Sequence, residues 1–439
     1  MTLIKSISGI RGTIGGKIGE SLTPIDVAKF TAAYGKWVKQ HTEQPKVVVG
    51  RDARISGAIL SGVVIATLRA MGIHVIHLGL STTPTVGMAV VSEKAQGGII
   101  LTASHNPGNW NALKMFNQEG EFISEEASKL ILSWAEDGEI EFATNQQLGS
   151  LVENDTYIDK HIEKILALPL VDISAIRAKN FRVIIDCVNS TGGIAVPKLL
   201  RALGVHQIEE LYCEPNGKFP HNPEPLPEHL AEISRRLQDG NFHVGFVVDP
   251  DVDRLVIMCE DGTPFGEEYT LVAVADYVLK NTVGNTVSNL SSTRALKDIT
   301  EKMGGEYFGS AVGEVNVVKT MKEVKAVIGG EGNGGVIYPE LHYGRDALVG
   351  IALFLSYLSK FNGSTKMLRA TYPSYYISKN KIELTPEIDV DRVLWEIQLR
   401  YRNNPINTID GVKIEFEKNW VHLRKSNTEP IIRIYAEAD

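Results

Sequence analysis

The residues best suited to chemistry lie in a polar loop that follows a short apolar run. Gly97 to Leu101 reads Gly-Gly-Ile-Ile-Leu, and the chain continues as Thr102-Ala103-Ser104-His105-Asn106-Pro107. The aliphatic run predicts a buried strand of a parallel sheet, and ligands of open α/β sheets bind at the carboxyl ends of such strands. Ser104, beside a histidine on a tight turn, is therefore suited to be a nucleophile or a phosphate carrier. Taken alone, these residues fit a simple strand-ending turn equally well.

A second candidate site is an alternation of carboxylates. Asp249, Asp251 and Asp253 directly follow the apolar run Val244 to Val248. Alternate carboxylates on a loop turn three hard oxygens toward one point, which suits Mg²⁺ and leaves room for a phosphate oxygen. A calcium loop of the EF-hand type is disfavoured because its sixth position must be glycine and is Arg254 here. A solvated acidic loop remains the alternative.

Two further loops suit a sugar phosphate. Glu331 stands among five glycines between Gly329 and Gly335, which predicts a place where sugar hydroxyls meet a carboxylate and backbone groups; a mobile glycine loop is the alternative. Arg424 and Arg433 bracket Ser426, Asn427 and Thr428. The paired N–H donors of an arginine guanidinium match the oxygens of a phosphate, so this segment predicts an anion-binding site. The alternative is a plain turn between two strands.

The elements that must position these loops form a repeated pattern along the chain. Strand and helix signals alternate three times, which predicts α/β units over residues 1–150, 151–254 and 255–365. A linker is expected at 361–365, and an α+β unit over 366–439. Each unit contributes one polar loop, so the loops are expected to meet in a cleft between domains. No Walker A motif, dinucleotide fingerprint or Gly-x-Ser-x-Gly elbow is present.

Composition excludes several classes of protein. The chain has 439 residues and a formal net charge of −8, which argues against a nucleic-acid partner. Its three scattered cysteines fit a reducing compartment. No apolar run approaches the length of a membrane span, and no secretory signal is visible at the N-terminus. We therefore expect a cytoplasmic protein with no membrane partner.

The four loops, in this order, resemble the α-D-phosphohexomutase superfamily over the whole chain. The matching stretches are Thr102 to Pro107, Asp249 to Arg254, Gly330 to Gly334, and Arg424 to Arg433. The resemblance implies an α/β fold of three consecutive domains with mixed sheets, plus a C-terminal α+β domain, around a central cleft. It also implies a phosphotransferase that interconverts sugar 6-phosphates and 1-phosphates.

The resemblance assigns roles to individual residues. Ser104 would carry the phosphoryl group, and Mg²⁺ would be held by that phosphoserine and by Asp249, Asp251 and Asp253. Lys114 would serve in proton transfer, while Arg11 and His105 would lie near the phosphoserine. Arg254 would neutralise charge on the transferring group, and the reaction would pass through a bisphosphosugar that also acts as activator. The sugar would contact Glu331, Gly332 and Asn333, and the distal phosphate would contact Arg424, Ser426, Asn427, Thr428 and Arg433.

One departure concerns the sugar loop. Most members of the superfamily have Ser-Gly-His where this chain has Asn333-Gly334-Gly335, so a hydroxyl becomes an amide and a histidine is absent. His342 follows on a different segment and is not assigned the missing role. The asparagine form resembles sequences grouped as phosphoglucosamine mutases in some bacteria and archaea, which predicts conversion of glucosamine 6-phosphate to glucosamine 1-phosphate for amino-sugar biosynthesis.

Three alternatives stay open at this point. The same mechanism could act on glucose or mannose phosphates as a phosphoglucomutase/phosphomannomutase. A non-catalytic regulatory protein that binds sugar phosphates, or a metal-dependent phosphatase, would use the same residues differently. The partner in each case is a hexose or hexosamine phosphate, and the sequence is compatible with a monomer or a homodimer.

Overall fold

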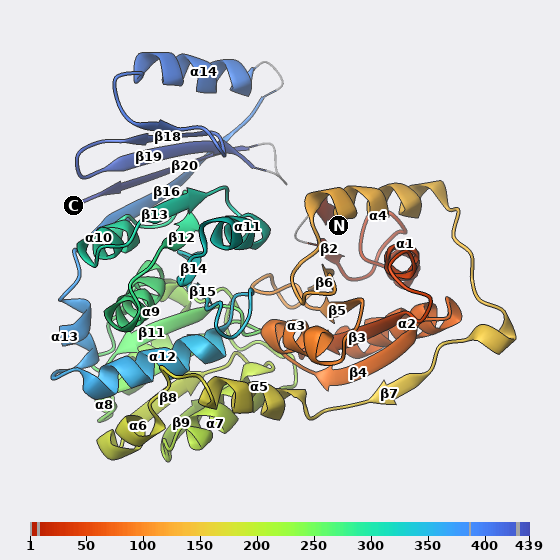
Figure 1. The fold of residues 1–439 in the computed structure, drawn as a ribbon, viewed down its shortest axis with the longest axis horizontal. Coiled ribbons are helices and arrows are strands. Elements are labelled where there is room, and N and C mark those ends of the chain that lie inside the picture. The colour runs from red at the N-terminus through yellow and green to blue at the C-terminus, as the bar shows by residue number, and fades with distance from the viewer. Residues whose placement is uncertain (1, 7–8, 386–387, 427–430) are drawn as a thin grey trace.

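The computed structural model describes residues 2–6, 9–385, 388–426 and 431–439. These residues form four sheets, each in its own structural unit. In Figure 1 the first unit lies on the right, and the other three stack on the left. The predicted fold class, three α/β domains followed by a C-terminal α+β domain, is confirmed.

The first domain is a mixed sheet of seven strands with helices on both faces. Parallel pairing joins β3, β4, β5 and β7, whereas β1, β2 and β6 pair antiparallel. Its strand order is β1-β2-β6-β5-β3-β4-β7. The elements are β1 Leu3–Ser6, β2 Gly9–Thr13, α1 Pro24–Lys39, β3 Lys46–Arg51, α2 Gly57–Ala70, β4 His74–Leu80, α3 Thr83–Ser92, β5 Gly97–Leu101, β6 Trp110–Phe116, α4 Glu125–Asp137, the 3₁₀ turn η1 Asn145–Gln147 and β7 Leu151–Glu153.

Local sequence signals explain where its helices begin. Thr23 caps α1 and forms a reciprocal capping box with Asp26, and Pro24 occupies the first turn. The Thr82 side chain caps α3 by accepting from the Thr85 amide, and Pro84 lies in the first turn. The caps satisfy amide donors that the first turn leaves unpaired. They fix the start of α3 beside the carboxyl ends of the strands.

The second and third domains are four-stranded mixed sheets that share one hydrophobic core. The second has the order β11-β10-β8-β9 and the third β13-β12-β14-β15. Helix α12 is almost wholly buried and packs against elements of both domains. The elements of the second domain are α5 Tyr157–Leu166, α6 Ile173–Lys179, β8 Arg182–Asp186, α7 Gly192–Ala202, β9 Gln207–Leu211, the 3₁₀ turn η2 Pro227–His229, α8 Ala231–Asp239, β10 Val244–Val248 and β11 Leu255–Cys259. The elements of the third domain are α9 Glu267–Asn281, β12 Thr286–Asn289, α10 Ala295–Lys302, β13 Tyr307–Ser310, α11 Glu314–Val324, β14 Ile328–Glu331, β15 Gly335–Ile337, α12 Ala347–Lys360 and α13 Thr365–Arg369.

Two predicted connections differ in the structure. The expected division between 254 and 255 falls inside an antiparallel pair, because β11 pairs along its whole length with β10. The segment 361–365, expected to be a linker, instead leads directly into α13, which Ser364 caps. Leu368 of α13 is buried in the core that the second and third domains share, so burial of apolar area keeps this segment with that core.

The fourth domain is an antiparallel sheet covered by one helix. The strand order is β16-β20-β19-β18-β17, and α14 packs its apolar side on the sheet. The elements are β16 Tyr376–Glu383, α14 Val390–Arg400, β17 Ile406–Asn407, β18 Val412–Glu415, β19 Trp420–Lys425 and β20 Ile431–Ala438.

Across the described ranges, none of the helices combines the length and the apolar character needed to cross a bilayer.

Candidate active site

Ser104 lies on the loop that leaves the buried strand β5, where the sequence places it. Its backbone has a φ of +48°, and its amide donates to Thr102 Oγ1 at 3.0 Å. The hydroxyl donates to Asp249 Oδ2 of the second domain at 2.6 Å. A left-handed conformation is uncommon for a residue with a side chain, and here it places Ser104 Oγ at the junction of two domains.

A buried arginine holds this loop in place. Arg54 donates from its two terminal nitrogens to the carbonyl oxygens of Ser104, Asn106, Pro107 and Trp110, at 2.5 to 3.0 Å. Its Nε donates to Asp52 Oδ2 at 3.0 Å, and Thr102 donates to the same oxygen. Arg54 was not among the residues predicted from the sequence. Its position in Gly50-Arg51-Asp52-Ala53-Arg54, after a buried strand, was the available signal.

The three aspartates converge as predicted. One oxygen from each carboxylate lies within 4.8 Å of the others, and all three residues are buried. Asp251 Oδ2 accepts from Lys114 Nζ at 2.7 Å and from the Thr83 hydroxyl at the start of α3. Asp253 Oδ2 accepts from Arg345 Nη2 at 2.6 Å. A cationic side chain therefore engages one oxygen of each of these two aspartates.

The remaining oxygens fit a divalent cation. Among the described residues, Oδ1 of Asp251 and Oδ1 of Asp253 are buried and have no hydrogen-bond partner. Burial, together with the neighbouring Asp251 and Asp253, raises the pKa of Asp249 well above its ordinary value. Buried acceptors that lack donors are costly, and hard carboxylate oxygens are ligands that Mg²⁺ prefers. The donor set therefore suits a magnesium ion.

The predicted sugar loop is a hairpin rather than a loop of free glycines. Gly329, Gly330 and Glu331 belong to β14, which pairs with β15. The Glu331 carboxylate is buried: Oε1 accepts from Asn289 Nδ2 at 3.0 Å and from the Gly313 amide at 3.2 Å, and Oε2 accepts from Arg345 Nη1 at 2.8 Å. Strand pairing and these bonds fix the glutamate, so the mobile-loop alternative is wrong.

Gly332 and Asn333 form the turn of this hairpin. A Cβ on Gly332 would lie 1.8 Å from Glu268 Oε2, so any larger residue there would require the Glu268 side chain to move. Asn333 Oδ1 accepts from the Gly335 amide at 3.2 Å, which closes the turn locally. The turn is also tied to the metal loop, because the Leu255 amide donates to Gly334 O at 3.0 Å.

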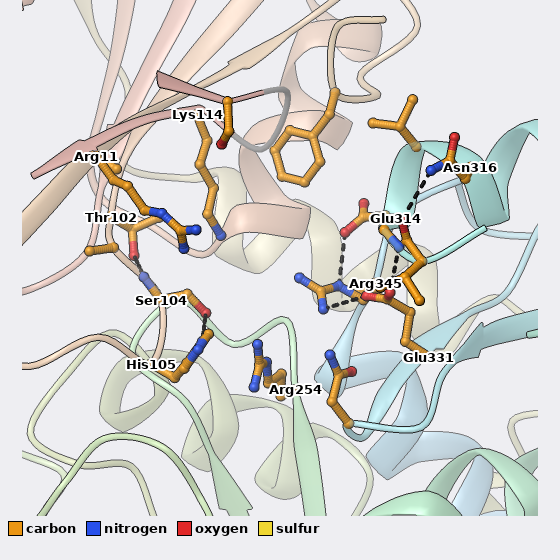
Figure 2. Close-up of a pocket in the computed structure, with 18 of the residues that line it drawn as sticks. Arg11, Thr102, Ser104, His105, Lys114, Arg254, Glu314, Asn316, Glu331 and Arg345 are labelled. Carbon is orange, nitrogen blue, oxygen red and sulfur yellow. Dashed lines mark hydrogen bonds and ion pairs between the residues drawn. The ribbon is translucent and has the colours of Figure 1, made fainter. Parts of the chain in front are cut away.

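These loops surround a cavity of about 630 Å³ between the first and third domains. Figure 2 shows Arg11, Ser104, His105 and Lys114 facing Glu314, Glu331 and Arg345 across it, with Arg254 between the two groups. The lining includes these residues together with Asn333 and Asp410. A cavity of this size that is lined by several charged side chains suits a small charged ligand. Glu314, Arg345 and Asp410 were not predicted from the sequence.

Comparison with known proteins agrees with this geometry. Four domain families match in order: "Phosphoglucomutase/phosphomannomutase, alpha/beta/alpha domain I" at 3–140, domain II at 156–262, domain III at 266–375 and the C-terminal domain at 382–439. The chain belongs to the phosphoglucomutase/phosphomannomutase family. It is an enzyme of the phosphohexomutase type, and the predicted superfamily is confirmed.

Individual relatives cover nearly the whole chain. A "Probable phosphoglucosamine mutase" of Methanopyrus kandleri is 33% identical over 98% of this chain and 93% of its own length. A "Phosphoglucomutase/phosphomannomutase" of Thermococcus kodakarensis is 34% identical over 97% and 94%. The solved structure of a phosphoglucomutase/phosphomannomutase family protein from Burkholderia thailandensis superposes with a TM-score of 0.87 at 26% identity, covering 99% of this chain and 93% of that one.

In this phosphohexomutase, burial and neighbouring charges together determine the protonation states of two cleft residues. Burial lowers the pKa of His105 well below its ordinary value, and Arg254, Lys114 and Arg345 lower it further, so its imidazole is neutral. Burial also lowers the pKa of Lys114, but Asp251 and Asp253 raise it more, and the net shift is upward. Lys114 is therefore an ammonium group in this state. It can donate a proton but cannot accept one.

The predicted phosphate cradle of this phosphohexomutase lies apart from the cavity. Arg424 and Arg433 are directly paired across β19 and β20, and the Ser426 amide donates to Ile431 O at 3.0 Å. None of these three residues lines the cavity; of the described lining residues, only Asp410 comes from the fourth domain. Asn427 and Thr428 lie outside the described residues. The fourth domain is docked on the third, where His422 Nδ1 lies 3.0 Å from Ser291 Oγ.

Proposed function

We propose that this phosphohexomutase interconverts glucosamine 6-phosphate and glucosamine 1-phosphate by way of a phosphorylated Ser104. One observation carries the proposal. The Ser104 hydroxyl lies 2.6 Å from Asp249, in a buried triad of carboxylates, and it lines a cavity that also contains Glu331 and Asn333. A nucleophile, a cation site and a sugar-sized cavity are thus adjacent.

The proposed cycle begins with Ser104 carrying a phosphoryl group. The bond between phosphorus and Ser104 Oγ breaks as a sugar oxygen bonds to phosphorus. The leaving serine oxygen takes a proton from the Lys114 ammonium, and the proton of the sugar hydroxyl then restores that ammonium. The resulting bisphosphosugar turns over in the cleft and returns its other phosphoryl group to Ser104. Positioning and electrostatics supply most of the rate in such transfers.

Each residue around Ser104 would have its own role in this cycle. Asp249, Asp251 and Asp253 would hold Mg²⁺ together with the phosphorylated serine, and Mg²⁺ supplies charge neutralisation at the transferring group. Arg254, part-buried beside the triad, adds positive charge there. The ammonium of Lys114 holds Asp251 and can give a proton to the serine oxygen as it leaves. Arg11 and His105 complete the wall around Ser104.

The sugar would be held from the opposite wall. Glu331 and the turn at Gly332 and Asn333 would meet the hydroxyl or amino groups of the ring. Arg424, Ser426 and Arg433, with Asn427 and Thr428, would hold the phosphate that is not reacting. Because this cradle lies outside the cavity wall in the present conformation, the proposal requires the fourth domain to approach the cleft when substrate binds.

The amino sugar is favoured by the Asn333-Gly334-Gly335 turn and by the name of the Methanopyrus kandleri relative. The name of the Thermococcus kodakarensis relative favours glucose or mannose phosphates as a second candidate by the same mechanism.

A coupled mutase assay on phosphorylated enzyme with Mg²⁺ tests the choice between these substrates. A large lead in kcat/KM for glucosamine phosphate is expected, and a lead for glucose or mannose phosphate would overturn the substrate assignment. If none of the three sugar phosphates is turned over, the alternative of a non-catalytic regulatory protein that binds sugar phosphates would be favoured instead.

Further proposals concern the whole chain. We place the protein in the cytoplasm as a monomer or homodimer whose partners are sugar phosphates. The predicted division near residue 150 is kept as a proposal, whereas β11 (Leu255–Cys259) belongs to the second sheet and α13 (Thr365–Arg369) to the core shared by the second and third domains.

A further inference from the structure

Arg345 is the most highly connected charged side chain between the metal loop and the sugar hairpin. Its three nitrogens reach three carboxylates: Nη2 donates to Asp253 at 2.6 Å, Nη1 to Glu331 at 2.8 Å and Nε to Glu314 at 2.8 Å. The Arg345 side chain is 9% exposed and lines the cavity, and Figure 2 shows it between Glu314 and Glu331. Arginine alone among side chains has a planar fork that can serve several acceptors at fixed angles.

The backbone around Arg345 is fixed to both of the segments that its side chain joins. The amide of Asp346 donates to Val336 O of the hairpin at 2.8 Å, and the amide of Ala347 donates to Val252 O of the metal loop at 3.1 Å. Asp346 also caps α12, because its Oδ1 accepts from the amides of Leu348 and Val349. The guanidinium is therefore held from a rigid base rather than from a free loop.

The contact with Asp253 determines which carboxylate oxygen is left for a cation. Arg345 occupies Oδ2, and Oδ1 is the buried oxygen that has no partner among the described residues. The contact with Glu331 occupies Oε2 and completes the bonds that fix this carboxylate. One guanidinium thus orients a proposed metal ligand and a proposed sugar ligand at the same time.

Gly335 is part of the same arrangement. A Cβ at position 335 would lie 2.3 Å from Arg345 Cδ and 3.0 Å from Cγ. Because three ion pairs hold the guanidinium of Arg345, its Cγ and Cδ atoms cannot move aside without weakening those ion pairs. The space in front of Gly335, where most members of the superfamily carry a histidine, is filled by Arg345.

We propose that Arg345 is a positioning residue that couples the metal site to the sugar site, orienting Asp253 and Glu331 together, and that Gly335 is required to admit it. The inference rests on the proposed metal and sugar roles of these loops. It assigns to Arg345 no proton transfer and no bond to the reacting phosphoryl group.

Arg345→Lys is the deciding variant because it keeps the charge and removes the fork. A lysine would still neutralise the negative charge of the carboxylates. Its single ammonium group, however, cannot reach Asp253, Glu314 and Glu331 in the geometry that the guanidinium provides. Binding is measured on the unphosphorylated full chain, with Mn²⁺ followed by electron paramagnetic resonance and glucosamine 6-phosphate followed by calorimetry. The Kd for each probe is expected to rise about tenfold, as when a partner of a metal ligand is removed or a charged hydrogen bond is lost.

Matched variants separate positioning from folding. Arg369→Lys changes an arginine with a buried carbonyl contact and a stacked tyrosine away from the cavity, and should leave both Kd values unchanged. Gly335→Ala keeps Arg345 but displaces it, and should weaken both probes even if Arg345→Lys fails to fold. Gly62→Ala, at a glycine with no neighbour within 4 Å of the added Cβ, should change neither.

The outcomes are distinct. Arg345→Lys with wild-type affinity for both probes, or a loss confined to one of them, would overturn the coupling. A lower melting temperature with both affinities retained would make Arg345 purely structural and would also overturn it. Wild-type protein that binds neither probe would instead overturn the proposed metal and sugar roles, and this inference with them.

Discussion

At the scale of single residues, the site is built by placing each reactive atom against a fixed charged group. Ser104 Oγ faces Asp249, Lys114 faces Asp251, and Arg345 faces Asp253. The contacts at Asp251 and Asp253 each leave Oδ1 without a hydrogen-bond partner among the described residues, whereas Oδ1 of Asp249 accepts from the amides of Asp253 and Arg254. Preorganised charge of this kind needs no rearrangement when charge develops during reaction.

Ser104→Ala is expected to abolish mutase turnover, to less than about 0.1% of the wild-type kcat, because the proposed phosphoryl acceptor is removed. The fold should remain intact. The coupled assay and circular dichroism measure the two effects. Ser81→Ala is the control, since Ser81 is also a buried serine. Substantial turnover by Ser104→Ala would refute the carrier role.

Arg54→Lys should destabilise the protein by about 3 kcal/mol, because lysine cannot serve four carbonyl oxygens and Asp52 together, and buried acceptors are left unpaired. Turnover should fall as well, since misplacing a reacting group by about 1 Å can cost about 100-fold in rate. Denaturant unfolding and kcat measure these effects. The exposed Arg392→Lys should stay within about 0.5 kcal/mol of wild type, and an equal effect of both variants would contradict the assigned role.

At the scale of elements, the hairpin β14–β15 depends on what lies beneath it. Glu268, in the first turn of α9, occupies the space below Gly332, and its Oε2 accepts from the Thr293 amide at 2.9 Å. Burial raises the pKa of Glu268 to about 8 against the opposing effect of Lys379. The folded protein therefore favours the neutral acid at this position.

The sign of the resulting pH dependence follows from proton binding. Between pH 4.5 and about 8 the folded state retains a proton that the unfolded state releases, so the stability contributed by Glu268 is present at low pH and is lost as pH rises. The loss is at most about 1.4 kcal/mol per pH unit. Glu268→Gln should remove this slope in unfolding experiments from pH 5 to 8. A parallel pH dependence in both proteins would show that Glu268 is not responsible.

At the scale of the whole molecule, the cleft joins a first domain to a fixed block of the second and third. The shared core makes the latter two one packed unit, while Lys322 of α11 reaches Glu119 and Glu121 of the first domain. The fourth domain contacts the third through His422 and Glu437. Interfaces of this polar kind permit movement between domains.

Arg433→Ala tests whether the fourth domain serves the cleft. It should weaken binding of glucosamine 6-phosphate by about 1.5–3 kcal/mol through loss of a charge-assisted contact. Calorimetric titration measures the change, with Arg402→Ala, an exposed arginine of the same domain, as control. Unchanged affinity would place the distal phosphate elsewhere.

Much of this protein is determined locally by its sequence. Apolar runs such as Ile99 to Leu101 and Val244 to Val248 form buried strands of two different sheets. The polar loops at the carboxyl ends of these strands carry Ser104 and the aspartates, and such strand ends are where α/β sheets bind ligands. Helix caps such as Thr23 and Thr82 depend on neighbours within three residues. These features could be predicted because their causes lie close together along the chain.

Tertiary structure alone decided the remainder. Arg345 meets Asp253 across 92 residues of sequence, and Arg54 meets the Ser104 carbonyl across 50. No local pattern distinguishes such arginines from solvated ones, because their partners are backbone oxygens and carboxylates brought near by packing. The absent side chain at Gly335 is visible in the sequence, but its physical reason, the space filled by Arg345, exists only once the hairpin and the segment before α12 are folded together.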